Sequence, residues 1–104
     1  RRWKMERLVE AVCKALRIDV ETLRGRERTQ DVSDKRTAVV YALLAGGYSA
    51  NEVAEAVCRD RTTVLACARR VNAWYKTRLY YDQAEFVERA REALRRAESE
   101  RAGG

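Results

Sequence analysis

The sequence predicts a single all-α domain of five or six helices that contains a helix-turn-helix. Apolar residues recur at helical spacing, no stretch alternates long enough to form a strand, and glycines or capping residues separate the periodic segments. The chain has 104 residues, of which 46% are hydrophobic and 37% charged, and this is enough for one buried core. We expect a main part over residues 1–78 and a C-terminal helical extension over residues 79–104 that packs on it.

The first part of the chain indicates two helices followed by a basic loop. Apolar residues at helical spacing predict an amphipathic helix over residues 2–17. Asp19 can cap a short second helix that runs to Leu23 and that Gly25 ends. The polar, basic stretch over residues 24–30 has no periodicity, so we expect a loop there.

A third and a fourth helix are expected over residues 31–57. Asp31 or Ser33 can cap the third, and the glycine pair at residues 46–47 ends it. Ser49 and Glu52 then form the S-x-x-E pattern of a capping box, in which each side chain accepts a hydrogen bond from the other residue's backbone N–H. This box opens the short fourth helix.

Asp60 can cap a fifth helix, which we expect to reach Arg78. Its apolar stripe consists of Val64, Cys67, Ala68, Val71, Trp74 and Tyr75. The fourth and fifth helices can hold their angle only by packing on the third, so Leu43, Val53, Val64 and Val71 should be buried together. Asp82 with Glu85 predicts another cap, before a final helix with apolar residues Phe86, Ala90, Leu94 and Ala97.

Positive charge is concentrated in two segments. The chain has 22 basic and 16 acidic residues, and 18 of the basic ones are arginine. Residues 59–78 carry a net charge of +5 and residues 24–36 one of +2, which is typical of a surface that binds a polyanion. If roughly five to seven of these cations meet phosphates, the logarithm of affinity should fall against that of salt with a slope near −5 to −6.

The composition also excludes several function classes. The chain has no histidine, which removes Ser-His-Asp and Cys-His catalysis and most zinc sites. Its three cysteines have no CxxC spacing, and we expect reduced thiols in the core. We therefore expect no enzyme, metal, cofactor or small-molecule substrate.

The hydropathy of the sequence indicates where the protein is located. No stretch is apolar and long enough to span a membrane, so we expect no membrane association and a cytoplasmic, nucleoid-associated location. The sequence begins with Arg1-Arg2 rather than Met, which suggests a piece of a larger protein.

Residues 49–78 predict a helix-turn-helix. A short capped helix, a tight connection and a second helix with basic and polar residues at its start follow one another. In this motif the N-terminus of the second helix enters the major groove, with the positive end of its dipole facing phosphates. Thr62 and Thr63 are short donors that can reach base edges or phosphate oxygens without filling the groove.

Two stretches match a pattern that belongs to one protein family. Residues 25–36 read G-R-E-R-T-Q-D-V-S-D-K-R, and residues 59–70 read R-D-R-T-T-V-L-A-C-A-R-R. Together they resemble the DNA-binding C-terminal domain of the bacterial replication initiator DnaA, which carries a basic loop and, later, R-D-H-T-T-V-L-x-A before a basic pair. The similarity spans about residues 5–74 and implies an all-α domain whose partner is double-stranded DNA.

The resemblance implies a role for each matching position. Arg28 would enter the minor groove, beside the helix in the major groove, while Asp60, Arg61 and Thr62 would face base edges. The residues that would contact the DNA backbone are Arg36, Thr37, Ser49, Thr63, Arg69 and Arg70. We add Lys35 to this group because of its charge and its proximity.

The chain departs from the family at two points. Arg61 stands where the family has histidine, and an arginine can bind guanine O6 and N7 with two hydrogen bonds. The turn before the second helix is one residue shorter, with Cys58 where the family usually has two glycines. Both departures bear on which DNA sequence is read.

Other interpretations stay open at this point. Asp60 can act as a cap alone, and Arg69, Arg70 and the loop arginines can belong to an ordinary solvated surface. The final helix, with six acidic and five basic residues after Tyr81, can instead serve for oligomerisation or protein interaction. The favoured hypothesis is a non-enzymatic, sequence-specific DNA-binding module of a replication, phage, transposon or regulatory protein.

Overall fold

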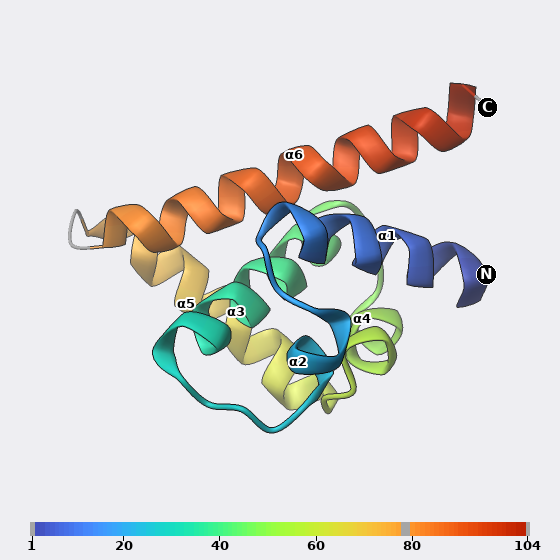
Figure 1. The fold of residues 1–104 in the computed structure, drawn as a ribbon. Coiled ribbons are helices and arrows are strands. Elements are labelled where there is room, and N and C mark those ends of the chain that lie inside the picture. The colour runs from blue at the N-terminus through green and yellow to red at the C-terminus, as the bar shows by residue number, and fades with distance from the viewer. Residues whose placement is uncertain (1, 78–79, 104) are drawn as a thin grey trace.

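A computed structural model describes residues 2–77 and 80–103, with side chains over residues 4–77 and 80–100. Its helices are α1 (Arg2–Ala15), α2 (Val20–Arg24), α3 (Gln30–Ala45), α4 (Ala50–Val57), α5 (Arg61–Lys76) and α6 (Tyr81–Gly103) (Figure 1). The described part of the chain contains no strand, so the all-α prediction is confirmed. The boundary expected between residues 78 and 79 lies outside the described residues.

Side-chain caps begin α4 and α5 as the sequence predicts. The Glu52 N–H donates to Ser49 Oγ at 3.1 Å and the Ser49 N–H donates to Glu52 Oε1 at 2.9 Å, which completes the capping box. The Thr63 N–H donates to Asp60 Oδ1 at 2.8 Å. Each cap satisfies backbone donors that a helix N-terminus leaves unpaired.

The other helix starts differ from the prediction. Thr29, rather than Asp31 or Ser33, caps α3 by accepting a hydrogen bond from the Val32 N–H at 3.4 Å. Asp19 occupies the N-cap position of α2 without a side-chain cap bond. α6 begins at Tyr81, so Asp82 lies in its first turn, where a carboxylate still complements the helix dipole.

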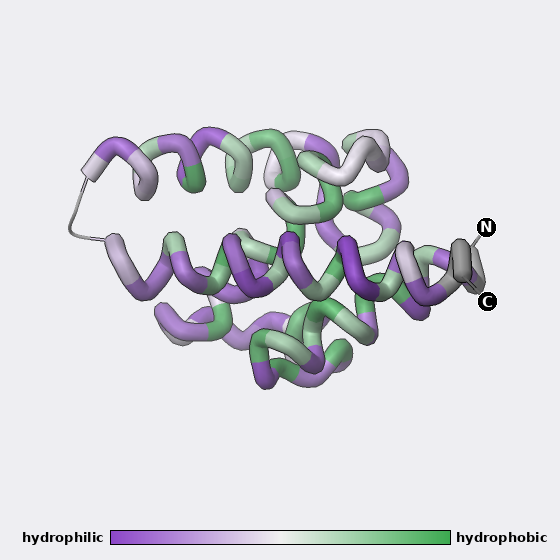
Figure 2. Tube along the Cα trace, turned by 90° about the horizontal axis from the view of Figure 1, so that it is seen from above, coloured by the Kyte–Doolittle hydropathy of each residue, from purple (hydrophilic) through white to green (hydrophobic). Residues whose placement is uncertain are grey.

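α6 closes the core from one side. It runs across the top of Figure 1, and its main contacts are with α3 and α1. Val87, Ala90 and Leu94 are its buried residues, and Figure 2 shows that hydrophilic residues separate such apolar positions along the helix. α3 and α6 approach so closely that a Cβ on Gly46 would lie 2.7 Å from Leu94 Cδ2.

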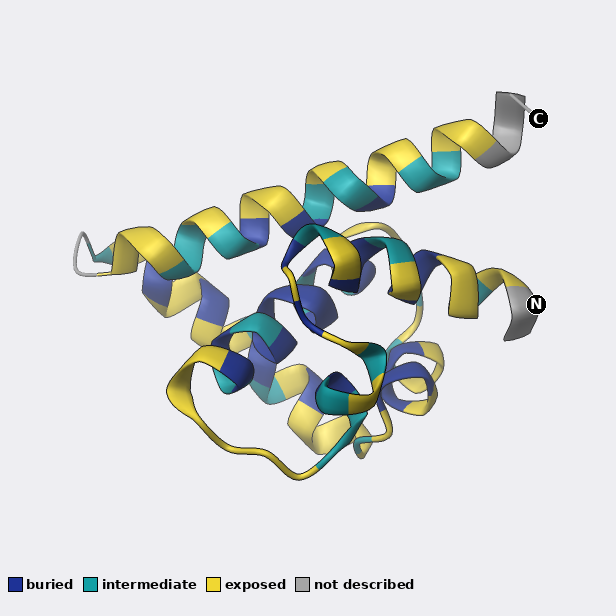
Figure 3. Ribbon diagram, viewed as in Figure 1, coloured by how far each residue is buried: buried dark blue, intermediate teal, exposed yellow. Residues whose placement is uncertain are grey.

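α4 and α5 pack on α3 through the residues that the sequence predicts. Leu43, Val53, Val64 and Val71 are fully buried, which confirms the register of α5 and leaves its basic face exposed (Figure 3). Tyr75 is the exception, because it is exposed rather than part of the stripe. Its hydroxyl donates to Glu88 of α6, and partial burial together with this bond raises the pKa of Tyr75 to about 12.

Candidate nucleic-acid interface

The loop between α2 and α3 and the first turn of α5 lie on the same side of the molecule, at the bottom of Figure 3. The loop exposes Arg26 and Arg28, and the first turn of α5 exposes Arg61, Thr62 and Thr63. Within the described part of the chain, none of these three arginines has an ion-pair partner. Their donors are therefore available to a ligand.

Asp60 fixes the geometry of the first turn of α5. Hydrogen bonds from Thr63, first from its N–H and then from its hydroxyl, lower the pKa of Asp60. Because the folded-state pKa is lowered, the cap contributes stability above the unfolded pKa and loses it as the pH falls through the folded value. The carboxylate is also fully exposed, so a role as cap and a contact with a base are compatible.

The turn between α4 and α5 contains a residue in a left-handed conformation. Cys58 has φ 56° and ψ 47°, a region that glycine adopts far more readily than residues with a Cβ. Cys58 is also exposed, which corrects its predicted place in the core, whereas Cys13 and Cys67 are buried as expected. Burial raises the pKa of both buried thiols, that of Cys13 to about 11.

Replacing Cys58 by glycine should stabilise the domain. The substitution relieves the strain of the left-handed conformation, but glycine has more conformational entropy to lose from the unfolded chain. The net effect is a gain of about 0.5–1 kcal/mol in the free energy of unfolding. Urea unfolding monitored by circular dichroism measures this gain. The matched variant Cys58→Ala removes the thiol but keeps the strain, so equal stabilities of the two variants would contradict the assigned conformation.

Arg36 lies inside the protein, which argues against its expected contact with the DNA backbone. The residue is 9% exposed, and its Nε donates to the Leu23 carbonyl at 2.7 Å. Its Nη2 donates, at distances between 3.2 and 3.4 Å, to the carbonyl oxygens of Thr22, Gly25 and Glu27. Arg36 therefore stabilises the backbone of the basic loop from within.

Thr37 is buried beneath the exposed basic surface, and Lys35 lies on another side of α3. Thr37 is 1% exposed and its hydroxyl accepts a hydrogen bond from Arg70 Nη1 at 3.1 Å. Lys35 pairs with Asp31 at 3.0 Å and lies 5.6 Å from the centre of the Phe86 ring of α6. Its ammonium is held on the α6 side of α3, which argues against its predicted phosphate contact.

The remaining predicted backbone contacts lie on the surface. Ser49 is exposed at the start of α4, and Thr63 and Arg69 are exposed on α5. Arg70 is exposed as well, although one of its donors is used by Thr37. The contacts of these four residues with phosphates therefore stay predictions.

Arg59, to which the sequence patterns assign no role, joins the turn to the loop. Its Nη1 donates to the Arg24 carbonyl at 3.1 Å and its Nη2 to the Gly25 carbonyl at 2.5 Å. Burial first, and then the charge of Arg59 with a further contribution from Arg28, lower the pKa of Arg36. The guanidinium groups of Arg36, Arg59 and Arg28 are thus close enough to interact.

Leu65 is the second residue that sequence analysis missed. It is 39% exposed and shares the outward face of α5 with Arg61, Thr62 and Arg69, since these positions lie within about one third of the helical circle. Helical spacing alone places Leu65 beside the basic residues and opposite the buried positions of the stripe, so this position could have been predicted from the sequence.

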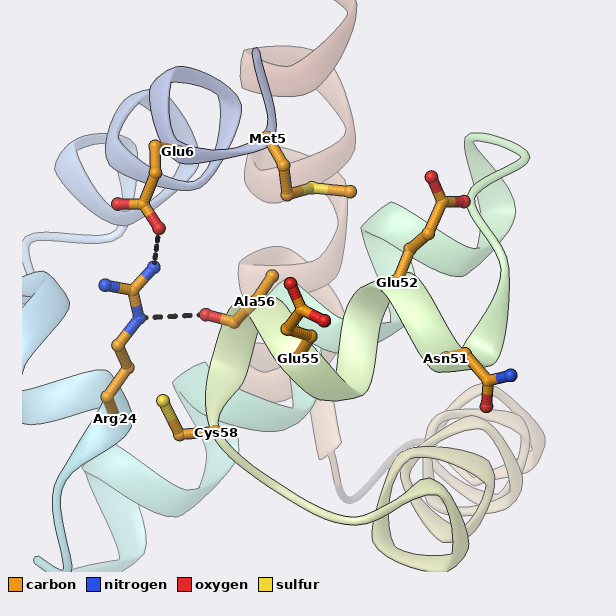
Figure 4. Close-up of a pocket in the computed structure, with 8 residues that line it drawn as sticks. All are labelled: Met5, Glu6, Arg24, Asn51, Glu52, Glu55, Ala56 and Cys58. Atoms are coloured by element: carbon orange, nitrogen blue, oxygen red, sulfur yellow. Dashed lines mark hydrogen bonds and ion pairs between the residues drawn. The ribbon is translucent and has the colours of Figure 1, made fainter. Parts of the chain in front are cut away.

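A hollow of about 510 Å³ between α1, α2 and α4 contains none of the predicted contact residues (Figure 4). It is lined by Met5, Glu6, Arg24, Asn51, Glu52, Glu55, Ala56 and Cys58. Arg24 crosses it, with its Nε donating to the Ala56 carbonyl at 2.8 Å and its Nη2 paired with Glu6 at 2.6 Å. The hollow therefore lies where these helices meet, and its rim is acidic, unlike the basic surface next to it.

Two capped helices joined by a three-residue turn, resting on α3 and flanked by a basic loop, define a helix-turn-helix domain. The chain matches the family described as the bacterial DnaA protein helix-turn-helix over residues 5–71. This match covers more than half of the chain, which therefore belongs to that family of DNA-binding domains. A search of curated proteins found no match. None of the described helices is long and apolar enough to cross a membrane.

Proposed function

We propose that this domain binds double-stranded DNA sequence-specifically, with the first turn of α5 in the major groove and Arg28 in the adjacent minor groove. The observation that carries the proposal is the joint exposure of the Arg28 loop and the Arg61–Thr62 turn, with Arg59 hydrogen-bonded between them. An α-helix fits the width of the major groove, and arginine is suited to the narrow minor groove. The function proposed is binding, without catalysis, within a replication, phage, transposon or regulatory protein.

Base reading is assigned to the first turn and phosphate binding to its surroundings. Arg61 and Thr62 point outward beside the exposed carboxylate of Asp60, which can accept a hydrogen bond from cytosine N4. The proposed phosphate contacts are Arg26, Ser49, Thr63, Arg69 and Arg70, all of which are exposed.

The alternative function, a protein-interaction or oligomerisation module, is less well supported. It relied on the C-terminal helix, yet α6 already uses Val87, Ala90 and Leu94 in its packing within the domain. Its outer side is charged with both signs, and its ion pairs join residues of α6 itself. No apolar stripe of α6 is left for a partner among the described residues.

Selection of bound duplexes from a random pool tests the proposal. We expect the selected pool to converge on one motif with a guanine at a fixed position, and the Arg61→Ala variant to lose the preference at that position. A pool that stays random after repeated rounds, with wild-type protein that is folded by circular dichroism, would refute sequence-specific binding.

Leu65 should contact the methyl group of a thymine in the selected motif. An apolar side chain on the major-groove face of α5 can bury that methyl, while uracil presents the same hydrogen-bonding groups without it. Replacing this thymine by uracil should weaken binding about fourfold, the value of one buried methyl group. Leu65→Ala should abolish the difference between the two duplexes, and a difference that persists would assign the methyl contact to another residue.

A further inference from the structure

Two arginines hold between them the backbone at the end of α2 and at the start of the basic loop. Arg59, in the turn before α5, donates to the carbonyls of Arg24 and Gly25, and Arg36 of α3 donates to a neighbouring set. The carbonyl oxygens that accept from one or both are those of Thr22, Leu23, Arg24, Gly25 and Glu27. The Gly25 carbonyl accepts from both, at 3.4 Å from Arg36 and 2.5 Å from Arg59.

The contact between loop and turn is reciprocal. Arg59 also donates to the Cys58 carbonyl at 3.0 Å, at the end of α4, while it holds the Arg24 carbonyl. Arg24 in turn donates from its Nε to the Ala56 carbonyl at 2.8 Å. The segment that follows α4 and the end of α2, where the loop begins, thus exchange side-chain donors, which also satisfies carbonyls that a helix C-terminus leaves unpaired.

This arrangement brings positive charges close together, and the several hydrogen bonds that Arg36 and Arg59 each make to carbonyls offset the electrostatic cost. Arg59 lies near enough to Arg36 to lower its pKa, and Arg28 acts in the same direction. A planar guanidinium with five donors can bind several carbonyls at once, which the single ammonium group of lysine cannot do in the same geometry.

We propose that Arg59 is a positioning residue that makes the loop and the first turn of α5 one rigid DNA-binding unit. Arg28 is held next to the major-groove residues before DNA binds. Binding therefore does not include the entropic cost of ordering Arg28 and its loop. Arg59 itself needs no contact with DNA. The inference rests on the proposed function, because it assigns Arg28 and Arg61 to adjacent grooves.

A double-mutant cycle tests the proposal by fluorescence anisotropy with a selected duplex. Arg28→Ala should weaken binding of the wild-type protein about tenfold, in the range of a lost specific contact. In an Arg59→Lys background, which keeps the charge, the same change should cost about threefold or less, a difference within the range measured for coupled residues. Arg59→Lys should leave the salt slope unchanged. Arg69→Lys, at an exposed arginine on α5, is the matched control and should leave the cost of Arg28→Ala at about tenfold.

Equal costs of Arg28→Ala in the wild-type and Arg59→Lys backgrounds would overturn the positioning role while the proposed function stands. Arg59→Gln, which removes the charge, should leave the salt slope unchanged. A slope lowered by about one unit in this variant would also overturn the positioning role, since Arg59 would then be a phosphate contact. Failure of wild-type protein to bind any duplex would refute the proposed function itself, before any variant is compared.

Amide relaxation of the wild-type protein without DNA provides a measurement that needs no variant. The amides of residues 25–28 should have order parameters near those of the flanking helices, about 0.85. Values below about 0.6 would show a mobile loop and overturn the proposal.

Discussion

Raising the salt concentration from 50 to 200 mM should weaken DNA binding by about 150- to 500-fold. The exposed arginines of the proposed interface are Arg26, Arg28, Arg61, Arg69 and Arg70. If four or five of them, whether at phosphates or in the grooves, each neutralise one phosphate charge, the slope in a plot of log affinity against log salt is about −3.6 to −4.5. This is shallower than the −5 to −6 expected from the sequence, because Lys35 and Arg36 are engaged within the protein.

Two variants calibrate the salt slope. Arg69→Ala should lower it by about one unit and weaken binding to all duplexes alike. Lys35→Ala removes the same charge from the α6 side of α3 and should leave the slope unchanged. A wild-type slope flatter than about −2, or equal effects of the two variants, would contradict the position of the interface.

Arg61→Ala should cost about 1–3 kcal/mol on the preferred site and much less on unrelated duplexes. Arg61 is exposed in the first turn of α5, where its guanidinium can donate two hydrogen bonds to guanine O6 and N7. Discrimination between sequences should therefore fall more than affinity. Competition between duplexes that differ at single base pairs measures both quantities.

Two alternatives for Arg61 give different outcomes. In one, Arg61 pairs with Asp60, but the Asp60 carboxylate accepts from Thr63 and no ion pair with Arg61 is present among the described residues. In the other, Arg61 contacts only a phosphate, and Arg61→Ala would then weaken every sequence equally. Arg61→His should shift the preference towards the usual site of the family, within the limits that the shorter turn at Cys58 sets.

Short sequence patterns predicted the features that depend on residues close together in the chain. The Ser49–Glu52 box and the Asp60 cap depend on residues three positions apart, and helical spacing identified the buried faces of α5 and α6. The start of α3 was harder, because Thr29, Asp31 and Ser33 are all capping residues within five positions. Which of them caps depends on how α3 packs, and with Thr29 as the cap residue Val32 is buried in the first turn of α3.

The direction of long side chains could not be predicted. Arg36, Arg59 and Arg28 belong to the same basic pattern in the sequence, yet the first two bind main-chain carbonyls and the third is exposed. An arginine buries its stem and satisfies its donors inside a protein as readily as at a phosphate, and the choice depends on carbonyls far away in the sequence. The same reason explains Lys35, which lies over a ring of α6 that follows it by about fifty residues.

Methylation interference tests the central claim most directly, because one reagent modifies both grooves. Dimethyl sulfate methylates guanine N7 in the major groove and adenine N3 in the minor groove, two atoms that protein side chains read. We expect interference at the guanine under Arg61 and at adenines in the adjacent minor groove. Arg61→Ala should remove the first signal only and Arg28→Ala the second only. Equal binding of all methylated duplexes, or loss of both signals in either variant, would contradict the account of α5 in the major groove and the loop beside it in the minor groove.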